Sequence, residues 1–162
     1  MPDLRELATA TALEIPQFIS ATALFQAAVA DQLGVTATEL HCLHLVSSGT
    51  ATSPTELARV LGMTTGALTR MLDRMERERL VERVPDPSDR RRLSIRPLGD
   101  RLEELAELYA PMARFLSEGL SRLDRRQLTA MLGFLNESRV HAEEEAARLR
   151  EDGAAHATRR VT

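Results

Sequence analysis

The chain has 162 residues, the size of one globular domain, and its hydrophobic fraction of 43% is ordinary for such a domain. The single cysteine excludes a disulfide framework, and 3% aromatic residues without tryptophan argue against a single-strand binder that stacks bases. The net charge of −3 excludes a uniformly basic nucleic-acid coat. All 21 basic residues are arginines, and 11 of them lie between Ser53 and Arg101 against 8 acidic residues, so a basic middle lies within an acidic frame.

The N-terminal segment, residues 4–32, is predicted to be a helix because its apolar residues recur at three- and four-residue spacings. Pro16 is expected to kink or restart this helix, since proline lacks an amide hydrogen, and Gly34 is expected to end it. The next helix begins after Thr36, which has the spacing of a capping box with Glu39. Acidic residues near the start and the lack of 18 uncharged apolar residues in a row predict neither a signal peptide nor a membrane span.

Two short helices joined by a glycine turn follow in the basic middle. Ser53 and Glu56 form a second capping box, Gly62 ends the first helix, and the second starts at Thr64 or Thr65. Such a pair is typical of a helix-turn-helix. The apolar face of its second helix has the spacing i, i+3, i+4, i+7 and consists of Leu68, Met71, Leu72 and Met75.

A β-hairpin is predicted after the helix-turn-helix. The strand-like segments Leu80–Val84 and Leu93–Arg96 flank a loop whose prolines and aspartates favour turns and which carries three consecutive arginines. A helix-turn-helix followed by an arginine-tipped hairpin is a winged helix. The chain returns to helix from about Gly99, Pro111 is a possible kink, and Asp124 caps the last helix. The end of the chain lacks apolar periodicity, which predicts a flexible tail over 150–162.

The segment TSPTELARVLGMTTGALTRMLDRMERERLVERVPDPSDRRR resembles the core of a MarR-family transcriptional regulator. The string Asp86-Pro87-Ser88-Asp89-Arg90-Arg91 matches the wing motif D-P-x-D-R-R of that family, and the resemblance covers roughly residues 10–148. The sequence departs from the family after the wing, where Pro97-Leu98-Gly99-Asp100-Arg101 replaces the usual L-T-x-x-G or P-T-x-x-G.

The resemblance implies a mainly α fold with a small β-hairpin wing, in a single domain over 1–162. Residues 36–98 are expected to form a winged helix-turn-helix DNA-binding lobe, and 1–33 with 99–149 a helical dimerisation lobe. The apolar stripes Leu4–Val29 and Leu128–Leu149 are the candidate two-fold interface.

The function implied by the resemblance is that of a cytoplasmic homodimeric transcriptional regulator. It would bind a pseudo-palindromic operator in double-stranded DNA, act by family default as a repressor, and be released by a small-molecule effector. One cysteine also fits the reducing cytoplasm. No enzyme motif occurs, whether a P-loop, a zinc-protease helix or a nucleophile elbow, so no catalytic residue, metal site or cofactor is predicted.

The DNA-binding residues follow from how a helix-turn-helix docks, with the exposed N-terminal face of its second helix in the major groove. Arginine can fork onto guanine there, although Arg70 and Arg74 can instead be solvated and pair with Asp73 or Glu78. The arginine-tipped wing fits a narrow minor groove. In the resembled family the aspartate of the motif orients the arginine two residues on, which implies that Asp89 orients Arg91 into the minor groove while Arg90 and Arg92 bind phosphates. The full candidate set is Thr64, Thr65, Gly66, Thr69, Arg70, Arg74, Asp89, Arg90, Arg91 and Arg92.

The small-molecule effector is expected to bind between the two lobes. Each candidate residue of that site is more often a packing residue than a ligand contact. Two sharper versions stay open, a redox sensor at Cys42 and a zinc sensor at His41 and His44. An alternative from another class is a helical protein-interaction module without specific DNA binding. The candidate walls of the effector site are Phe18, Phe25, His41, His44 and Tyr109.

Overall fold

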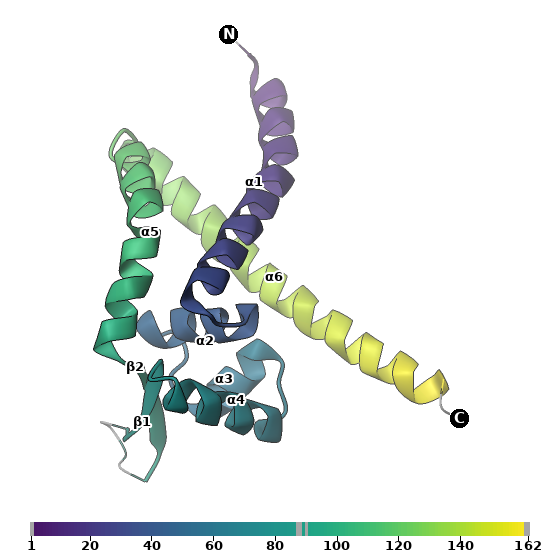
Figure 1. Cartoon of the computed structure of the whole chain (residues 1–162). Helices are drawn as coiled ribbons and strands as arrows, with labels where there is room; N and C mark the ends of the chain where they lie inside the picture. The colour runs from purple at the N-terminus through teal and green to yellow at the C-terminus, as the bar shows by residue number, and fades with distance from the viewer. Residues whose placement is uncertain (1, 87–88, 90, 161–162) are drawn as a thin grey trace.

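The computed structural model describes residues 2–86, 89 and 91–160. It is mainly helical with a two-stranded antiparallel hairpin, as the sequence predicts (Figure 1). The elements in chain order are α1 (Leu4–Leu33), α2 (Ala37–Ser47), α3 (Pro54–Leu61), α4 (Thr65–Arg77), β1 (Val81–Pro85), β2 (Leu93–Pro97), α5 (Gly99–Leu120) and α6 (Arg125–Arg160).

Local capping chemistry sets most helix boundaries. The capping box of Thr36 with Glu39 opens α2, and the box of Ser53 with Glu56 opens α3, both as predicted. Gly34 and Gly62 end α1 and α3 in the left-handed conformation, with φ of 67° and 65°. The start of the recognition helix α4 is fixed in the same way, because the Thr64 hydroxyl accepts a hydrogen bond from the Ala67 amide.

The winged-helix lobe consists of α2, α3, α4 and the hairpin, which lie together at the lower end of the molecule (Figure 1). Strands β1 and β2 pair from Val81↔Pro97 to Pro85↔Leu93. The hairpin is also pinned to the segment before α3, since the Ile95 amide donates to the Thr52 carbonyl at 2.7 Å. The fully buried side chains that hold this lobe together include Leu57, Leu68, Leu72, Met75, Leu80 and Ile95.

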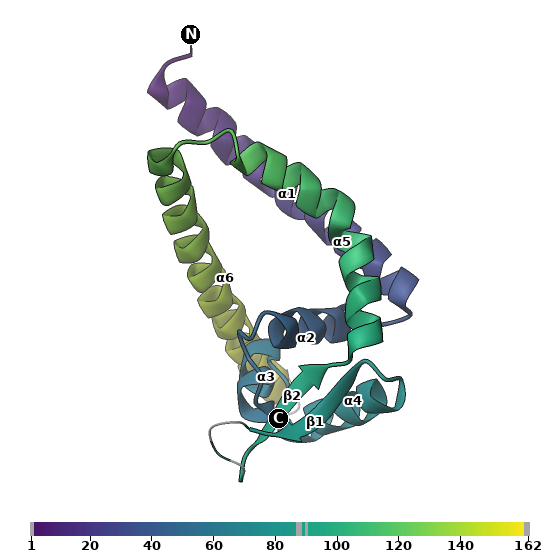
Figure 2. The ribbon, with the colours of Figure 1, turned by 90° about the vertical axis from the view of Figure 1, so that its left-hand side faces the viewer.

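The helical lobe is formed by α1, α5 and α6. Helix α1 contacts α5 where Phe25 packs on Tyr109, and α6 diverges from the far end of α5 (Figure 2). Both α1 and α5 are continuous through Pro16 and Pro111, so neither proline restarts a helix. Only the C-terminal end of α1 enters the core, through Val29, Ala30 and Leu33, which leaves most of its apolar face exposed.

Helix α6 is longer than the sequence predicted. It continues to Arg160, whereas a helical lobe ending at 149 was expected. Absence of an apolar stripe misled that prediction, because the segment after Gly153 is rich in alanine, the residue with the highest intrinsic helix propensity. On its way α6 passes the winged-helix lobe, where the Arg150 side chain lies against Gly62.

By length and composition, α1 is apolar enough to cross a membrane, with a mean hydropathy of 1.2 over its most apolar 18-residue window. This differs from the sequence analysis, which required a run without charged residues.

Candidate nucleic-acid interface

The first two turns of α4 present small polar and basic residues to solvent. Thr65, Gly66, Thr69 and Arg70 are all exposed there, while the opposite side of the helix is buried in the core. The Thr69 hydroxyl donates to the Thr65 carbonyl at 2.9 Å, so this side chain lies along the helix. These are the predicted contact residues of the recognition helix, and the structure places them on one continuous face.

Arg70 is the free cation of this face. Within the described part of the chain its guanidinium has no ion pair or hydrogen bond, and its Nη1 lies 3.8 Å from where a Cβ would stand on Gly66. The side chain therefore covers the first turn of α4, beside main-chain amides that have no partner inside the helix. A cation and free amide hydrogens together favour a negatively charged ligand.

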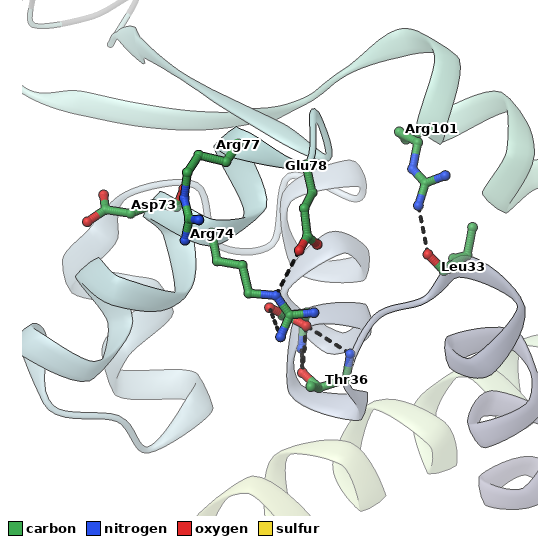
Figure 3. A network of polar contacts seen from close by, with 8 residues as sticks. Leu33, Thr36, Asp73, Arg74, Arg77, Glu78 and Arg101 are labelled. Carbon is green, nitrogen blue, oxygen red and sulfur yellow. Dashed lines mark hydrogen bonds and ion pairs between the residues drawn. The ribbon is translucent and has the colours of Figure 1, made fainter.

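Arg74 is placed differently from Arg70, although it is one turn along the same helix. Its guanidinium points to α2, where Nη1 lies 3.5 Å from Oε1 of the buried Glu39, and its Nε donates to Glu78 at 3.0 Å (Figure 3). The hydrogen bond to Glu78 and the charges of both carboxylates raise the pKa of the Arg74 guanidinium. The sequence analysis foresaw the pairing with Glu78 as an alternative, but it did not foresee Glu39.

Arg83 on β1 is a residue that sequence reasoning missed. Its Nη2 forms an ion pair with Asp73 at 2.8 Å, and its Nη1 binds Glu76. Its main-chain amide also donates to Glu76 at 2.9 Å, so the first wing strand is fixed to α4 by both side chain and main chain. The clue in the sequence was two carboxylates at i, i+3 on the polar face of α4, which need a cation from elsewhere.

The wing tip is organised by its aspartates. The Asp89 carboxylate accepts from the Arg91 amide at 3.0 Å, and the Arg92 amide donates to the Asp89 carbonyl at 2.8 Å. Asp89 thus contacts Arg91 through the main chain, while the exposed Arg91 side chain has no partner in the described residues. Hydrogen bonds from Ser53 are the main cause of the lowered pKa of the Glu56 carboxyl, and the positive charge of Arg92 lowers this pKa further. The predicted Arg90 lies outside the described residues.

Three of the five predicted effector-site residues come together at the junction of the lobes. The Tyr109 ring of α5 packs edge to face against Phe25 of α1 and His44 of α2. The ring centroids are 5.1 Å apart in the first pair and 5.2 Å apart in the second. The Tyr109 hydroxyl is buried without a hydrogen-bond partner. Burial lowers the pKa of His44 and raises that of Tyr109, so both rings are neutral at pH 7. Phe18 and His41 are exposed and lie outside this cluster.

The two sharper sensing alternatives receive no support from their surroundings. Cys42 is fully buried, and burial together with the charge of Glu39 raises its pKa to about 12, so the thiol is protonated at neutral pH. Among the described residues, no three histidine, cysteine or acidic side chains gather closely enough to hold a metal ion.

This arrangement, two helices crossing at a glycine turn with an arginine-bearing hairpin beside the second helix, defines a winged helix-turn-helix protein. The sequence profile of the MarR family matches residues 35–93. Residues 35–93 of the chain thus carry the domain of the MarR family, a family of DNA-binding transcriptional regulators.

Individual relatives agree with this assignment. The Bacillus subtilis protein YcgE, named as an uncharacterized helix-turn-helix regulator, is 29% identical over 130 residues, or 80% of this chain and 84% of that protein. The multiple antibiotic resistance protein MarR of Escherichia coli is 42% identical over 59 residues, or 36% of this chain and 41% of MarR. A MepR variant of S. aureus has the same fold, with a TM-score of 0.63 at 16% identity, covering 82% of this chain and 96% of MepR. A second MepR variant, bound to an oligodeoxyribonucleotide, has a TM-score of 0.52 at 16% identity, covering 82% of this chain and 97% of that protein.

Proposed function

We propose that this chain is a repressor that binds a pseudo-palindromic operator as a homodimer and leaves it when a small effector binds. The observation that carries the proposal is the free Arg70 on the exposed first turns of α4, with the arginine-bearing wing fixed beside it by Arg83. Such a protein acts where the DNA is, so we place it in the cytoplasm.

The proposed contacts divide between the two grooves. Thr65, Thr69 and Arg70 meet base edges in the major groove, where an arginine on guanine is worth about 1–3 kcal/mol of discrimination. The capping Thr64 and the side-chain-free Gly66 let the amides of the first turn approach a phosphate. On the wing, Arg91 enters the minor groove, positioned by Asp89, and Arg90 and Arg92 bind phosphates. The MepR variant bound to an oligodeoxyribonucleotide has the same fold.

The second copy is proposed to cover the helical lobe. Most of the apolar face of α1 is exposed, and in α6 every described side chain outside Gly133 and Glu145 is exposed, including Leu132 at 61%. Two long helices with uncovered apolar stripes are unfavourable in water, and a two-fold partner covers them. This interface also accounts for the apolar character of α1. A dimer would read half-sites about 34 Å apart.

The effector site is proposed around Tyr109, Phe25 and His44. A buried hydroxyl without a partner costs about 1–3 kcal/mol, which a ligand that accepts a hydrogen bond would recover. The three rings come from α1, α2 and α5, so a ligand between them would bear on both lobes.

The test is binding to the DNA flanking the chain's own gene, measured by fluorescence anisotropy at about 50 and about 200 mM salt with a scrambled duplex as reference. We expect tight, salt-sensitive binding to a short pseudo-palindrome. Arg70→Met should reduce preference for the operator, and Arg91→Ala should weaken binding. Arg122→Met, in the turn between α5 and α6 at the far end of the molecule, is the matched control and should bind normally.

Binding without salt dependence or sequence preference on any DNA selected from the genome would contradict the proposal. It would favour the helical protein-interaction module, which has no use for phosphate contacts. A wild-type protein that stays monomeric while binding its operator tightly would contradict the dimer alone.

A further inference from the structure

Arg74 is bound by two carboxylates on the side of α4 that faces α2. Its side chain is 39% exposed, and the Glu39 side chain, on the other helix, is 2% exposed. A base-reading arginine must leave its protein partners before it contacts DNA. Leaving Glu39 would leave a buried carboxylate without the positive charge that faces it, which is unfavourable. Arg74 is therefore held where it is.

Glu39 is itself fixed, because its two carboxylate oxygens have separate partners. Oε2 accepts from the Thr36 amide at 2.8 Å and from the Thr36 hydroxyl at 2.9 Å, which closes the N-terminus of α2. Oε1 faces Arg74. The carboxylate that begins α2 is thus the same group that holds the recognition helix.

The corner between α1 and α2 is fixed from its other side as well. Arg101, in the first turn of α5, donates through Nη2 to the Leu33 carbonyl at 2.7 Å, at the end of α1 (Figure 3). Polar contacts therefore run from α5 to the end of α1, and from the start of α2 to α4. Only Gly34 and Val35 separate Leu33 from Thr36.

We propose that Glu39 and Arg74 are a positioning pair that sets how α4 is presented to the operator, and that Arg74 contacts neither base nor phosphate. The proposal rests on the proposed function and refines its recognition surface. The contacts of α4 with the core are apolar, through Leu68, Leu72 and Met75, and apolar packing has no preferred direction of its own. The other charged contact of α4, with Arg83, joins it to the wing and not to α2. A charged pair with defined geometry supplies that direction and fixes the helix about its axis.

The test compares Glu39→Gln, Arg74→Met and the double variant for affinity to the operator and to a scrambled duplex over a range of salt. Glutamine still closes the capping box, so Glu39→Gln removes the charge and leaves the helix start in place. We expect each single variant to lower the operator-to-scrambled affinity ratio by about tenfold, within the range of coupled pairs, and the double variant to lose no more than either single. The salt slope should stay at the wild-type value.

Three controls separate positioning from other roles. Arg74→Lys keeps the charge facing Glu39 and should recover part of the lost preference. Arg92→Ala should lower the salt slope, because Arg92 is proposed to bind a phosphate and each lost phosphate contact reduces the slope by about 0.9. In NMR spectra without DNA, Glu39→Gln and Arg74→Met should shift the same α4 amide signals, a response that does not depend on the operator.

The opposite results are equally clear. If Arg74→Met lowers the salt slope by about 0.9, the amount for one phosphate contact, while Glu39→Gln binds normally, Arg74 contacts DNA and the inference is wrong. Unchanged α4 signals in both variants would also overturn it, whatever the DNA result. A wild-type protein that ignores the operator would instead refute the proposed function, and the α4 signals would still report on the pair.

Discussion

The guanidinium of Arg83 on β1 forms an ion pair with Asp73 on α4, with 2.8 Å between Nη2 and Oδ1. Glu76 on the next turn of α4 binds both the side chain and the amide of Arg83. The wing is therefore aligned with α4 by one residue near the base of the hairpin, and the arginines at its tip depend on that alignment.

Replacing this residue should disturb DNA binding at a distance. Arg83→Met is expected to weaken operator binding, because the wing loses its orientation, and to lower the free energy of unfolding by about 1 kcal/mol for a partly exposed ion pair. Urea unfolding and anisotropy titration measure the two effects. Glu82→Gln, the exposed neighbour on the same strand, is the control and should change neither. Normal operator binding by Arg83→Met would show that the wing needs no such tie.

The residue that follows the C-cap of α4, Arg79, offers a stabilising substitution. Arg79 has a φ of 56°, and its amide and that of Leu80 close the helix on Glu76 and Met75. A left-handed conformation costs a non-glycine residue about 1–2 kcal/mol. Glycine avoids this cost but loses about 0.5–1 kcal/mol, because it gives up more conformational entropy on folding. Arg79→Gly should therefore raise the free energy of unfolding by about 0.5 kcal/mol with operator binding unchanged.

The matched control for this substitution is Arg79→Ala, which removes the same side chain and keeps the strained backbone. Its stability should stay near that of the wild type, because the strain of the backbone remains. The lost ion pair of Arg79 with Asp100 contributes little, since it is 4.0 Å long and both side chains are exposed. Equal stability of the glycine and alanine variants in urea would contradict the strain at this position.

What the sequence could predict depended on how local the determining contacts are. The starts of α2 and α3 were predicted because each capping box lies within four residues. The partners of Arg74 and Arg83 were harder to predict. Glu78 is one helical turn from Arg74, but Glu39 belongs to another helix and only the fold brings it near. Arg83 likewise lies on a strand and pairs with acids of α4. The end of α6 was misjudged because an alanine-rich segment has no apolar stripe to reveal a helix.

The effector cluster shows the same limit. Aromatic and histidine residues could be nominated from the sequence, but not sorted, since Phe18 and Phe25 have similar chemistry and differ only in which turn of α1 reaches α5. Only Phe25 packs on Tyr109.

The thiol of Cys42 should be inert in the folded protein. With no exposed surface and a pKa raised to about 12, it has almost no thiolate at neutral pH. Iodoacetamide at pH 7.5 should leave the native protein unmodified and alkylate it fully in urea, which mass spectrometry of the intact chain detects. Rapid labelling under native conditions would revive the redox alternative.

Acidification should destabilise the junction of the lobes through His44. Burial and the nearby His41 lower its pKa below 6.5 in the folded chain, so the unfolded chain binds a proton more readily. Stability from this group is complete above the ordinary value of 6.5 and is lost as the pH falls below it. Thermal unfolding between pH 7.5 and 5 should show a smaller decline for His44→Gln than for wild type. His141→Gln, exposed on α6, should decline as wild type does; equal slopes for both variants would argue against the junction.

Helix α5 starts at Gly99, with only Leu98 between it and β2, and the Leu98 amide is held by the Leu80 carbonyl at 3.0 Å. The wing therefore continues directly into a helix of 22 residues, about 33 Å along its path at about 1.5 Å per residue, which bends between its ends (Figure 2). A continuous helix of this length acts as a lever: when it turns as one body, each degree of tilt at its wing end moves the opposite end by up to about 0.6 Å. A displacement of about 6 Å near the turn to α6 thus corresponds to a rotation of about 10° at the wing, so a shift in packing at one end of α5 becomes a change of angle at the other.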